Sequence, residues 1–317
     1  MTRYVLRRLA QGAVVLWAAF TVTFAILYLL PSDPVELMAS GGGEQSVVDP
    51  ALLAELRAEH GLDRPPLAQY LHALGGAARL DFGRSYQSDA PATSLILDVL
   101  PQTLQLTVAG LALSVLLGVG LAVASTYPRT RWLRHALAAL PPLGVSLPVF
   151  WVGLMLVQVF SFQWRLFPAI GNDGLASLVL PAVALALPTS ASIAQLLARS
   201  LRQTLAEPYI ETARAKGAGR ARVHFRHALR NASIPALTVL GVSVGQLLSG
   251  AVVTETVFSR VGLGRLTISA VNSQDIPVVM AVVVFSALVF VVVALAVDLL
   301  YPLVDPRISL RRAPVAA

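Results

Sequence analysis

Seven consecutive residues combine one carboxylate, two cations and several small side chains: Glu211-Thr212-Ala213-Arg214-Ala215-Lys216-Gly217. We expect Pro208 to begin a short helix here, with Glu211 near its positive N-terminal end. The alanines keep one side small, so that a partner's surface can come close, and Gly217 permits a sharp turn. The pattern indicates noncovalent docking of another protein. The alternative is a solvated basic loop that fixes topology and touches anionic lipid.

Two other groups of residues could do chemistry, and both are weaker candidates. His224 and His227 are three residues apart and could bind a metal, but no third ligand is evident, and a basic surface is the better interpretation. Asp298 follows the last apolar run and could pair with Arg307 or a neighbouring helix, or reach the lipid headgroups. No cluster of nucleophile, base and metal ligands is present, so we expect no catalytic residue.

Cysteine and lysine usage narrows the functions further. The chain has no cysteine, which excludes disulfides, iron–sulfur clusters and thiolate metal sites. A P-loop requires Gly-Lys-Ser/Thr, whereas the single lysine, Lys216, lies between Ala215 and Gly217. We therefore expect no metal and no cofactor on this chain, and no ATP binding through a P-loop.

The elements that must position these residues are membrane helices. Hydrophobic residues make up 56% of the chain and charged residues only 13%, far from the composition of a soluble domain. Uncharged apolar runs of about 20 residues can cross about 30 Å of hydrocarbon as helices. Six are present: 9–30, 103–127, 136–162, 175–198, 234–254 and 276–297. The first is too long for a secretory signal peptide and lacks a cleavage site. We expect an all-α membrane protein with six transmembrane helices.

The net charge of +7 is distributed unevenly among the connections between these runs. With the N-terminus inside, 17 of the 24 lysines and arginines fall on the inner side, eight of them within residues 199–230. The first outer segment, residues 31–98, holds ten of the 17 acidic residues. This positive-inside distribution explains the basic composition without nucleic acid, and it predicts that both termini are cytoplasmic.

The polar segment after the first run is too long for a simple turn. Asp49-Pro50 predicts a capped helix, Pro65-Pro66 predicts a second helix over about 67–74, and the glycines at 41–43 predict a flexible connection. We expect four regions: a cytoplasmic tail with the first helix (1–30), an extracytoplasmic segment (31–97), a domain of five helices (98–307) whose basic loop covers about 199–231, and a cytoplasmic tail (308–317).

Prolines and neutral polar residues occur inside the apolar runs. The third run contains Pro141, Pro142 and Pro148, and the fourth contains Pro181 and Pro188. Each removes a helical hydrogen bond that in lipid must be satisfied by neighbours or water. They indicate either ordinary kinks in a packed bundle or kinked helices that line a path which opens and closes. The candidate polar residues along such a path are Gln105, Gln158, Gln195 and Gln246.

From Glu207 onward the chain resembles the oligopeptide/dipeptide class of ABC importer permeases, specifically the member of the permease pair with a large first external segment. The matching strings are Tyr209-Ile-Glu-Thr-Ala-Arg-Ala-Lys-Gly217, His227-Ala-Leu-Arg-Asn231, Gly250-Ala-Val-Val-Thr-Glu-Thr-Val-Phe-Ser259, Gly262-Leu-Gly-Arg265, Asp275-Ile-Pro-Val-Val279, Asp298-Leu-Leu-Tyr301 and Asp305-Pro-Arg307. Arg7-Arg8-Leu9, Leu30-Pro-Ser-Asp-Pro34 and Asp81-Phe-Gly-Arg-Ser85 extend the resemblance over nearly the whole chain.

One departure narrows this resemblance. The general importer-loop motif ends in Ile-x-Leu-Pro, ten residues after its glycine. This chain has His227-Ala-Leu229-Arg230 in that place, and its proline follows at Pro235. The peptide-type subgroup is similar in this respect, so the docking role implied for the loop remains.

The resemblance implies a type I ABC importer permease fold and a transport subunit, not an enzyme, that moves dipeptides or oligopeptides across the bacterial cytoplasmic membrane. The implied partners are a homologous second permease, two cytoplasmic ATPases that bind ATP and Mg, an extracytoplasmic substrate-binding protein and membrane lipid, with no nucleic acid. Glu211 to Gly217 would dock an ATPase. The residues implied at an external gate or binding-protein contact are Glu255, Phe258, Arg260, Gly262, Gly264 and Arg265; alternatively, they are solvated helix ends.

Other functions remain open. Related permeases handle nickel, metal chelates, glutathione or short oligosaccharides. From a different class, an ion-coupled secondary transporter or channel predicts ionisable residues at mid-membrane or discontinuous helices that bind ions. The six apolar runs contain no Asp, Glu, Lys or Arg, which counts against that class.

Overall fold

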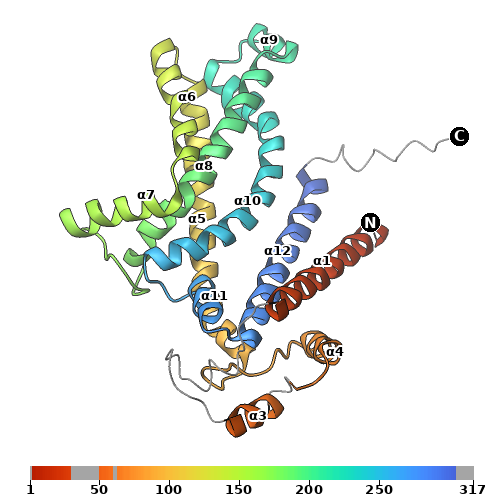
Figure 1. Cartoon of the computed structure of the whole chain (residues 1–317). Helices are drawn as coiled ribbons and strands as arrows, with labels where there is room; N and C mark the ends of the chain where they lie inside the picture. The colour runs from red at the N-terminus through yellow and green to blue at the C-terminus, as the bar shows by residue number, and fades with distance from the viewer. Residues whose placement is uncertain (1, 30–49, 60–62, 305–317) are drawn as a thin grey trace, which may run out of the picture. The chain divides into compact units, whose positions relative to one another are not determined.

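The computed structural model describes residues 2–29, 50–59 and 63–304 (Figure 1). These residues form helices, connecting loops and one isolated β-bridge between Arg84 and Pro91. They divide into two compact units. Unit 1 contains the described residues up to Thr103 together with Val261–Val291, and unit 2 contains Leu104–Arg260 with the described residues after Val291. The expected glycine connection at 41–43, the Asp49 cap and the tail at 308–317 lie outside the described residues.

Long apolar helices account for most of both units. The helices that lie or begin in unit 1 are α1 (Thr2–Leu29), α3 (Pro50–Glu59), α4 (Pro66–Ala77), α5 (Ala92–Thr126), α11 (Leu263–Asn272) and α12 (Ile276–Val304). Those of unit 2 are α6 (Arg131–Ser146), α7 (Val149–Leu156), the π-helix η1 (Val157–Gln163), α8 (Ala176–Leu205), α9 (Pro208–Ala215), the π-helix η2 (Arg222–Ala228) and α10 (Leu229–Val257).

Five helices of the described residues are long and apolar enough to cross a membrane. They contain Val5–Leu27, Ala92–Thr126, Ala176–Leu205, Val239–Val257 and Ile276–Ala296. Each of these segments overlaps one of the six runs expected from the sequence, with bounds that differ by up to 11 residues, which confirms five of the expected spans as single helices. A sixth span is reached if α6 and α7–η1 together count as one.

The third expected span, residues 136–162, is not one straight helix. Its two halves, Arg131–Ser146 and Val149–Gln163, are bent by 104° at a short break. Leu147 is extended (φ −86°, ψ 126°) because the ring of the following proline disfavours the α region for the residue before it. Pro148 then precedes α7 (φ −62°, ψ 135°). One proline of the three therefore breaks the helix, whereas Pro141 and Pro142 lie inside α6.

Helix α8 forms the centre of unit 2 (Figure 1). In its apolar window 61% of the residues are buried, against at most 33% in any other candidate span. Different residues of α8 belong to three separate hydrophobic clusters. Leu180 and Ala184 pack with Val152 and Phe258, Ala182 and Leu185 pack with Leu106 and Leu247, and Leu197 and Leu201 pack with Ala122, Ile210 and Ala232. The helix that carries the basic loop is thus also the one that the rest of unit 2 surrounds.

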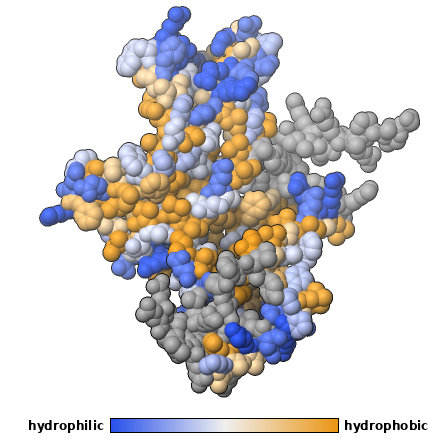
Figure 2. Space-filling model, in the orientation of Figure 1, coloured by the Kyte–Doolittle hydropathy of each residue, from blue (hydrophilic) through white to orange (hydrophobic). Residues whose placement is uncertain are grey.

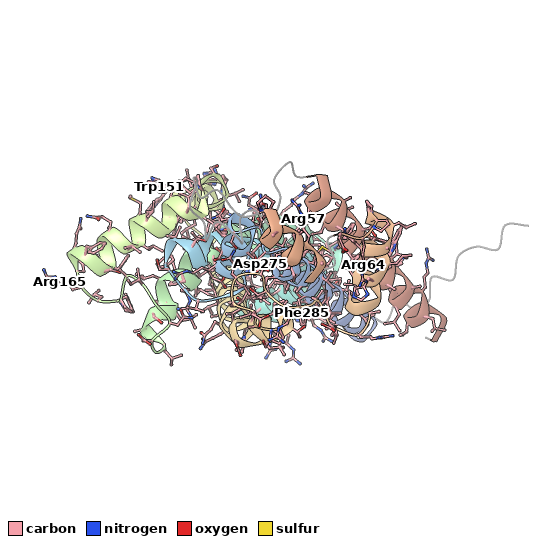
Figure 3. All side chains as sticks on the ribbon, turned by 60° about the horizontal axis from the view of Figure 1, so that its bottom comes forward. Arg57, Arg64, Trp151, Arg165, Asp275 and Phe285 are labelled. Atoms are coloured by element: carbon pink, nitrogen blue, oxygen red, sulfur yellow. The ribbon has the colours of Figure 1, made fainter. Side chains whose placement is uncertain are left out.

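In unit 1, helix α4 is hydrogen-bonded to the first candidate span, α1. The hydroxyl of Tyr70 on α4 accepts a hydrogen bond of 3.0 Å from the indole nitrogen of Trp17 and lies 2.9 Å from Oγ1 of Thr21, both on α1. Helix α4 starts at Pro66, as the sequence predicts, but continues to Ala77. Phe285 on α12, labelled in Figure 3, packs against Phe82 with the rings tilted by 53° and their centroids 6.1 Å apart.

Large apolar side chains remain exposed along the helices of unit 2. Examples are Leu116 on α5, Leu143 on α6 and Trp151 on α7. Figure 2 shows an apolar surface over these helices, with hydrophilic residues gathered at the end that carries α9 and the start of α6. An apolar surface of this kind suits contact with lipid or with other membrane subunits.

Candidate docking site

The two basic connections of unit 2 lie at the same end of that unit (Figures 1 and 2). One is the short segment from Arg129 to Arg134, and the other contains α9 and η2. The loop from Trp164 to Leu175 lies toward the other end, below α7 in the view of Figure 1. The sequence assigned the two basic connections to one side of the membrane, and the fold of unit 2 places them together.

Helix α9 begins in the way that its sequence predicts. Glu207 is extended before the first turn (φ −70°, ψ 145°), and Pro208 follows at a position where a missing N–H costs nothing. Glu211 lies in the first turn, where a carboxylate interacts favourably with the helix dipole. Ile210 is fully buried and packs into the cluster formed by α8, η2 and α10. One apolar side chain therefore anchors the helix to the hydrophobic core of unit 2.

Gly217 ends α9 in a Schellman motif. Its backbone has φ +82°, in the left-handed region that favours glycine. The Gly217 amide donates to the Arg214 carbonyl at 2.9 Å, and the Ala218 amide donates to the Ala213 carbonyl at 3.0 Å. These two bonds define the motif and satisfy carbonyls left over at the helix end. The glycine of the seven-residue pattern is thus required by the backbone of this chain, independently of any partner.

The docking residues are available for a partner. Glu211, Thr212, Arg214, Ala215, Lys216 and Gly217 are exposed, and Ala213 is half-buried. An added Cβ at Gly217 would have no neighbour of this chain within 4 Å. Their role in contacting an ATPase stays a prediction, but the helix presents all but one of its predicted contact residues to solvent.

A hydrogen-bonded bracket that sequence reasoning did not assign holds α9 in place. The Tyr209 hydroxyl accepts a bond of 2.9 Å from the Asn231 side-chain amide and donates to the His227 carbonyl at 3.3 Å. Tyr209, His227 and Asn231 all occur in the strings that carry the family resemblance. The spacing of these three residues in the sequence does not predict their contact, because the contact depends on how α9 packs against η2 and α10.

His224 is buried beside α5. Its Nε2 atom lies 3.4 Å from Oγ1 of Thr126, and its ring packs edge-on against Tyr127 with centroids 5.3 Å apart. Burial, and secondarily the positive charge of Arg220, lower the pKa of His224. Within the described residues no group of three His, Cys, Asp or Glu side chains surrounds it, so the structure supplies no further ligand for the metal alternative.

Most of the six residues implied at an external gate or binding-protein contact are buried in this chain and pack against its other segments. In unit 2, Arg260 is 1% exposed, and its Nη1 atom donates to the Gly171 carbonyl at 3.1 Å and to the Ser177 carbonyl at 3.0 Å. Burial lowers the pKa of Arg260, and the negative charge of buried Glu255 partly offsets this. The guanidinium thereby fixes the loop before α8 to the end of α10.

Of the other residues implied at this gate or contact, three are buried and one is exposed. Phe258 is buried in unit 2, and an added Cβ at Gly153 would come within 3.2 Å of its ring. In unit 1, Gly262 and Gly264 are buried at the start of α11, and Arg265 is exposed. A contact with a binding protein stays a prediction for all six residues, and Arg265 presents its side chain most directly for it.

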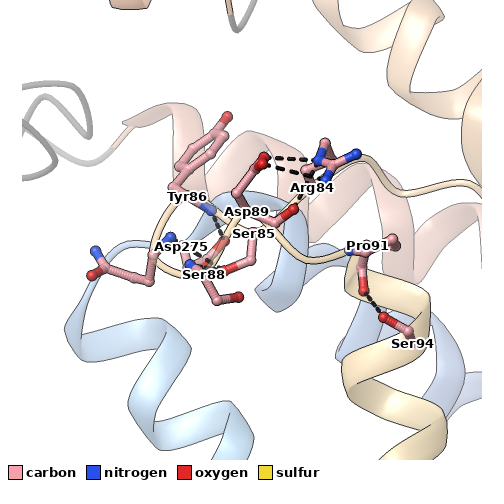
Figure 4. A network of polar contacts seen from close by, with 9 residues as sticks. Arg84, Ser85, Tyr86, Ser88, Asp89, Pro91, Ser94 and Asp275 are labelled. Atoms are coloured by element: carbon pink, nitrogen blue, oxygen red, sulfur yellow. Dashed lines mark hydrogen bonds and ion pairs between the residues drawn. The ribbon is translucent and has the colours of Figure 1, made fainter.

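A buried carboxylate organises a polar network in unit 1 (Figure 4). Asp275 is 3% exposed; it accepts a 2.5 Å bond from the Ser85 hydroxyl and a 3.1 Å bond from the Tyr86 amide. The Ser85 oxygen in turn accepts bonds from the Gln87 and Ser88 amides. Burial, and then the charge of Asp275, raise the pKa of Tyr86 to about 12. The network joins residues 84–91 to the start of α12.

The expected path residues share one property. Gln105, Gln158, Gln195 and Gln246 are all exposed on this chain. A primary amide that faces hydrocarbon without a hydrogen-bond partner is costly. These side chains therefore require water, a second subunit or a transported molecule beside them, although their role in a path stays a prediction.

Comparison with known families and proteins places the chain. Residues 114–310 match the family model described as binding-protein-dependent transport system inner membrane component, and residues 1–107 match the N-terminal model of such membrane components. The chain is 36% identical to the dipeptide transport system permease protein DppB of Escherichia coli strain K12, over 97% of this chain and 99% of that protein. It is also 36% identical to a probable peptide ABC transporter permease protein of Sinorhizobium fredii, over 96% and 98% respectively.

Solved structures agree on the fold. A MetNI methionine ABC transporter in an inward-facing conformation matches with a TM-score of 0.54 at 18% identity, covering 67% of this chain and 96% of its own. An amino acid ABC transporter with histidines matches with a TM-score of 0.50 at 20% identity, covering 68% and 94%. The fold is that of a type I ABC importer permease, and the chain belongs to the family of binding-protein-dependent transport system inner membrane components.

Proposed function

We propose that this chain is the permease subunit of an ATP-driven importer of dipeptides or oligopeptides. It lies in the bacterial inner membrane with both termini in the cytoplasm. It pairs with a homologous permease, docks one of two cytoplasmic ATPases and receives its ligand from an extracytoplasmic binding protein. ATP and Mg²⁺ bind to the ATPases. Support for the peptide substrate comes from the names of relatives that match over nearly their whole length.

The observation that carries the proposal is helix α9, which is exposed, begins at Pro208 and ends in the Schellman motif at Gly217. A partner that moves α9 would move the membrane helices, because Ile210 packs on Leu197 and Leu201 of α8. The bond from Asn231 to Tyr209 adds a second connection, to α10. A helix anchored in this way can transmit the closure of an ATPase as a rigid-body displacement.

The composition of the spans supports a permissive path. The exposed glutamines are neutral, so they can hydrogen-bond a peptide backbone without favouring one side-chain charge. Fixed charges would select ligands by the cost of desolvating a mismatched charge. We therefore assign the choice of ligand mainly to the external binding protein, and the conduction step to this chain and its homologous partner.

Uptake in proteoliposomes tests the function. With the second permease, both ATPases and the binding protein present, we expect ATP-dependent accumulation of labelled dipeptides or oligopeptides. Nickel ions, glutathione and a short oligosaccharide serve as competing substrates under the same conditions. The purified chain alone is expected to bind no ATP. Accumulation of one of the competitors instead of peptides would contradict the substrate assignment while leaving the transport class intact.

Thiol labelling tests the orientation, and the cysteine-free background makes it clean. Ser85 is buried against Asp275, so the exposed Ser88 is the better external position. We expect Ser88→Cys to react with an impermeant maleimide in intact cells, and Arg222→Cys to react only after the membrane is opened. The reverse pattern would place α9 outside the cell and rule out docking of a cytoplasmic ATPase.

A further inference from the structure

A pocket of 390 Å³ lies beside the docking helix in unit 2. Its walls come from the ends of α5 and α8, from α9, from the turn after it and from η2. The lining residues are Thr126, Leu205, Arg214, Ala218, Arg220, Val223 and His224. The volume is within the range of pockets that hold small molecules, and the lining combines apolar walls with two arginines.

Within the described part of the chain, Arg214 and Arg220 of the pocket have no acidic partner. Residues 199–230 contain only two carboxylates, Glu207 and Glu211. Among the ion pairs of the described residues, none involves Arg214 or Arg220. Arg220 is held by donation to the Tyr127 carbonyl and by the Tyr127 ring, whose centroid lies 4.8 Å from its guanidinium carbon. The pocket is therefore positively charged and partly preorganised.

His224, the third ionisable group of the pocket, lines it with a polar side chain and adds no fixed charge. The Thr126 hydroxyl donates to the Ala122 carbonyl at 2.8 Å, so its oxygen can accept a hydrogen bond from the nearby Nε2–H of His224. Because burial and Arg220 lower the pKa of His224, the positive charge at neutral pH comes from the two arginines. An anion in the pocket would meet two guanidinium groups that can each donate two parallel hydrogen bonds.

The position of the pocket along the spans points to the lipid headgroup layer. Thr126 and Leu205 are the last residues of two candidate spans. At 1.5 Å per residue, the 30 residues of α8 extend about 45 Å, which is the thickness of a bilayer with its headgroups. The ends of these helices therefore emerge where phosphate groups of lipids lie, on the side that carries the basic connections.

We propose that this pocket binds a phosphate group, that of an anionic phospholipid headgroup, between Arg214 and Arg220. Basic pockets between membrane helices on the cytoplasmic side are suited to such headgroups. Arg214 belongs to α9, so a bound lipid would fasten the docking helix to the bilayer surface. Coupling to an ATPase would then depend on the content of anionic lipid.

Native mass spectrometry of the full chain in uncharged detergent tests the site. Separate titrations use phosphatidylglycerol, phosphatidylcholine and inorganic phosphate, with no ATPase present, so the result is independent of the proposed docking. We expect phosphatidylglycerol to bind at least about tenfold more tightly than phosphatidylcholine, the scale of hydrogen bonds to a charged group. Arg214→Gln and Arg220→Gln are each expected to weaken its binding about tenfold.

Two further variants test whether binding is specific to the pocket. Arg222→Gln removes a positive charge that is also exposed, from η2 outside the pocket, and is expected to leave binding unchanged. Ala218→Leu fills the pocket without changing its charge and is expected to weaken binding. An equal loss in Arg222→Gln would show nonspecific surface attraction and overturn the site. Inorganic phosphate that binds as tightly as phosphatidylglycerol would assign the pocket to free phosphate. Absence of lipid binding, with ATPase capture weakened by both pocket variants, would assign the arginines to an acidic side chain of the ATPase.

Discussion

Replacing Gly217 by leucine is expected to abolish ATP-driven uptake while the protein still inserts into the membrane. The left-handed backbone at this position (φ +82°) costs a residue with a side chain roughly 1–2 kcal/mol, so the end of α9 would rearrange. No atom of this chain lies within 4 Å of the added Cβ, so the side chain itself would obstruct only an approaching partner. Both effects act on the contact with the ATPase, and proteoliposome uptake measures their sum.

Gly219 supplies the matched control. It is exposed, has no neighbour within 4 Å of an added Cβ, and is not among the glycines with positive φ. Gly219→Leu is therefore expected to retain most of the uptake. Gly217→Asn separates backbone from bulk, because asparagine tolerates the left-handed region better than leucine does. If the assembled complex with Gly217→Leu transported at the normal rate, α9 would not be the docking element.

Local signals in the sequence predicted helix α9 well. Pro208 and Gly217 mark its first and last turns, and both do so through properties of their own backbone that no tertiary contact needs to supply. The apolar runs predicted five single spans for the same reason, since length and hydrophobicity are local. A break in the third run could also be predicted, because a proline constrains the residue before it. The run contains three prolines, however, so the sequence did not show that the break lies at Pro148.

Contacts between distant segments were not predictable in this way. Glu255 and Arg260 look like solvated charges at the end of a span, and only the fold shows them buried, with Arg260 bonded to the loop before α8. Ser85 and Asp275 are separated by 190 positions, so no spacing rule connects them. Arg260 and Asp275 are charged and buried, and hydrogen bonds to distant segments satisfy both. The sequence does not show where those segments lie.

Replacing Asp275 by alanine is expected to release residues 84–91 from the start of α12 and to destabilise unit 1 by about 3 kcal/mol. The change leaves the buried Ser85 hydroxyl and the Tyr86 amide without their acceptor, and unpaired buried donors cost about 1–3 kcal/mol each. Hydrogen–deuterium exchange of the segment is the direct measurement. The amides of Tyr86, Gln87 and Ser88 all donate into this network, so they should exchange faster together.

Asp89→Ala is the control for this prediction, since it removes a carboxylate from the same segment. The ion pair between Arg84 and Asp89 is 2.7 Å long, but both side chains are mostly exposed, and such surface pairs contribute at most about 1 kcal/mol. We expect its exchange at Tyr86 to Ser88 to match that of the unaltered protein. Asp275→Asn keeps the shape and one acceptor oxygen, so its exchange should lie between the other two. Equal exchange in Asp275→Ala and Asp89→Ala would mean that the buried carboxylate does not hold residues 84–91, and that the bonds within this segment are sufficient to fold it.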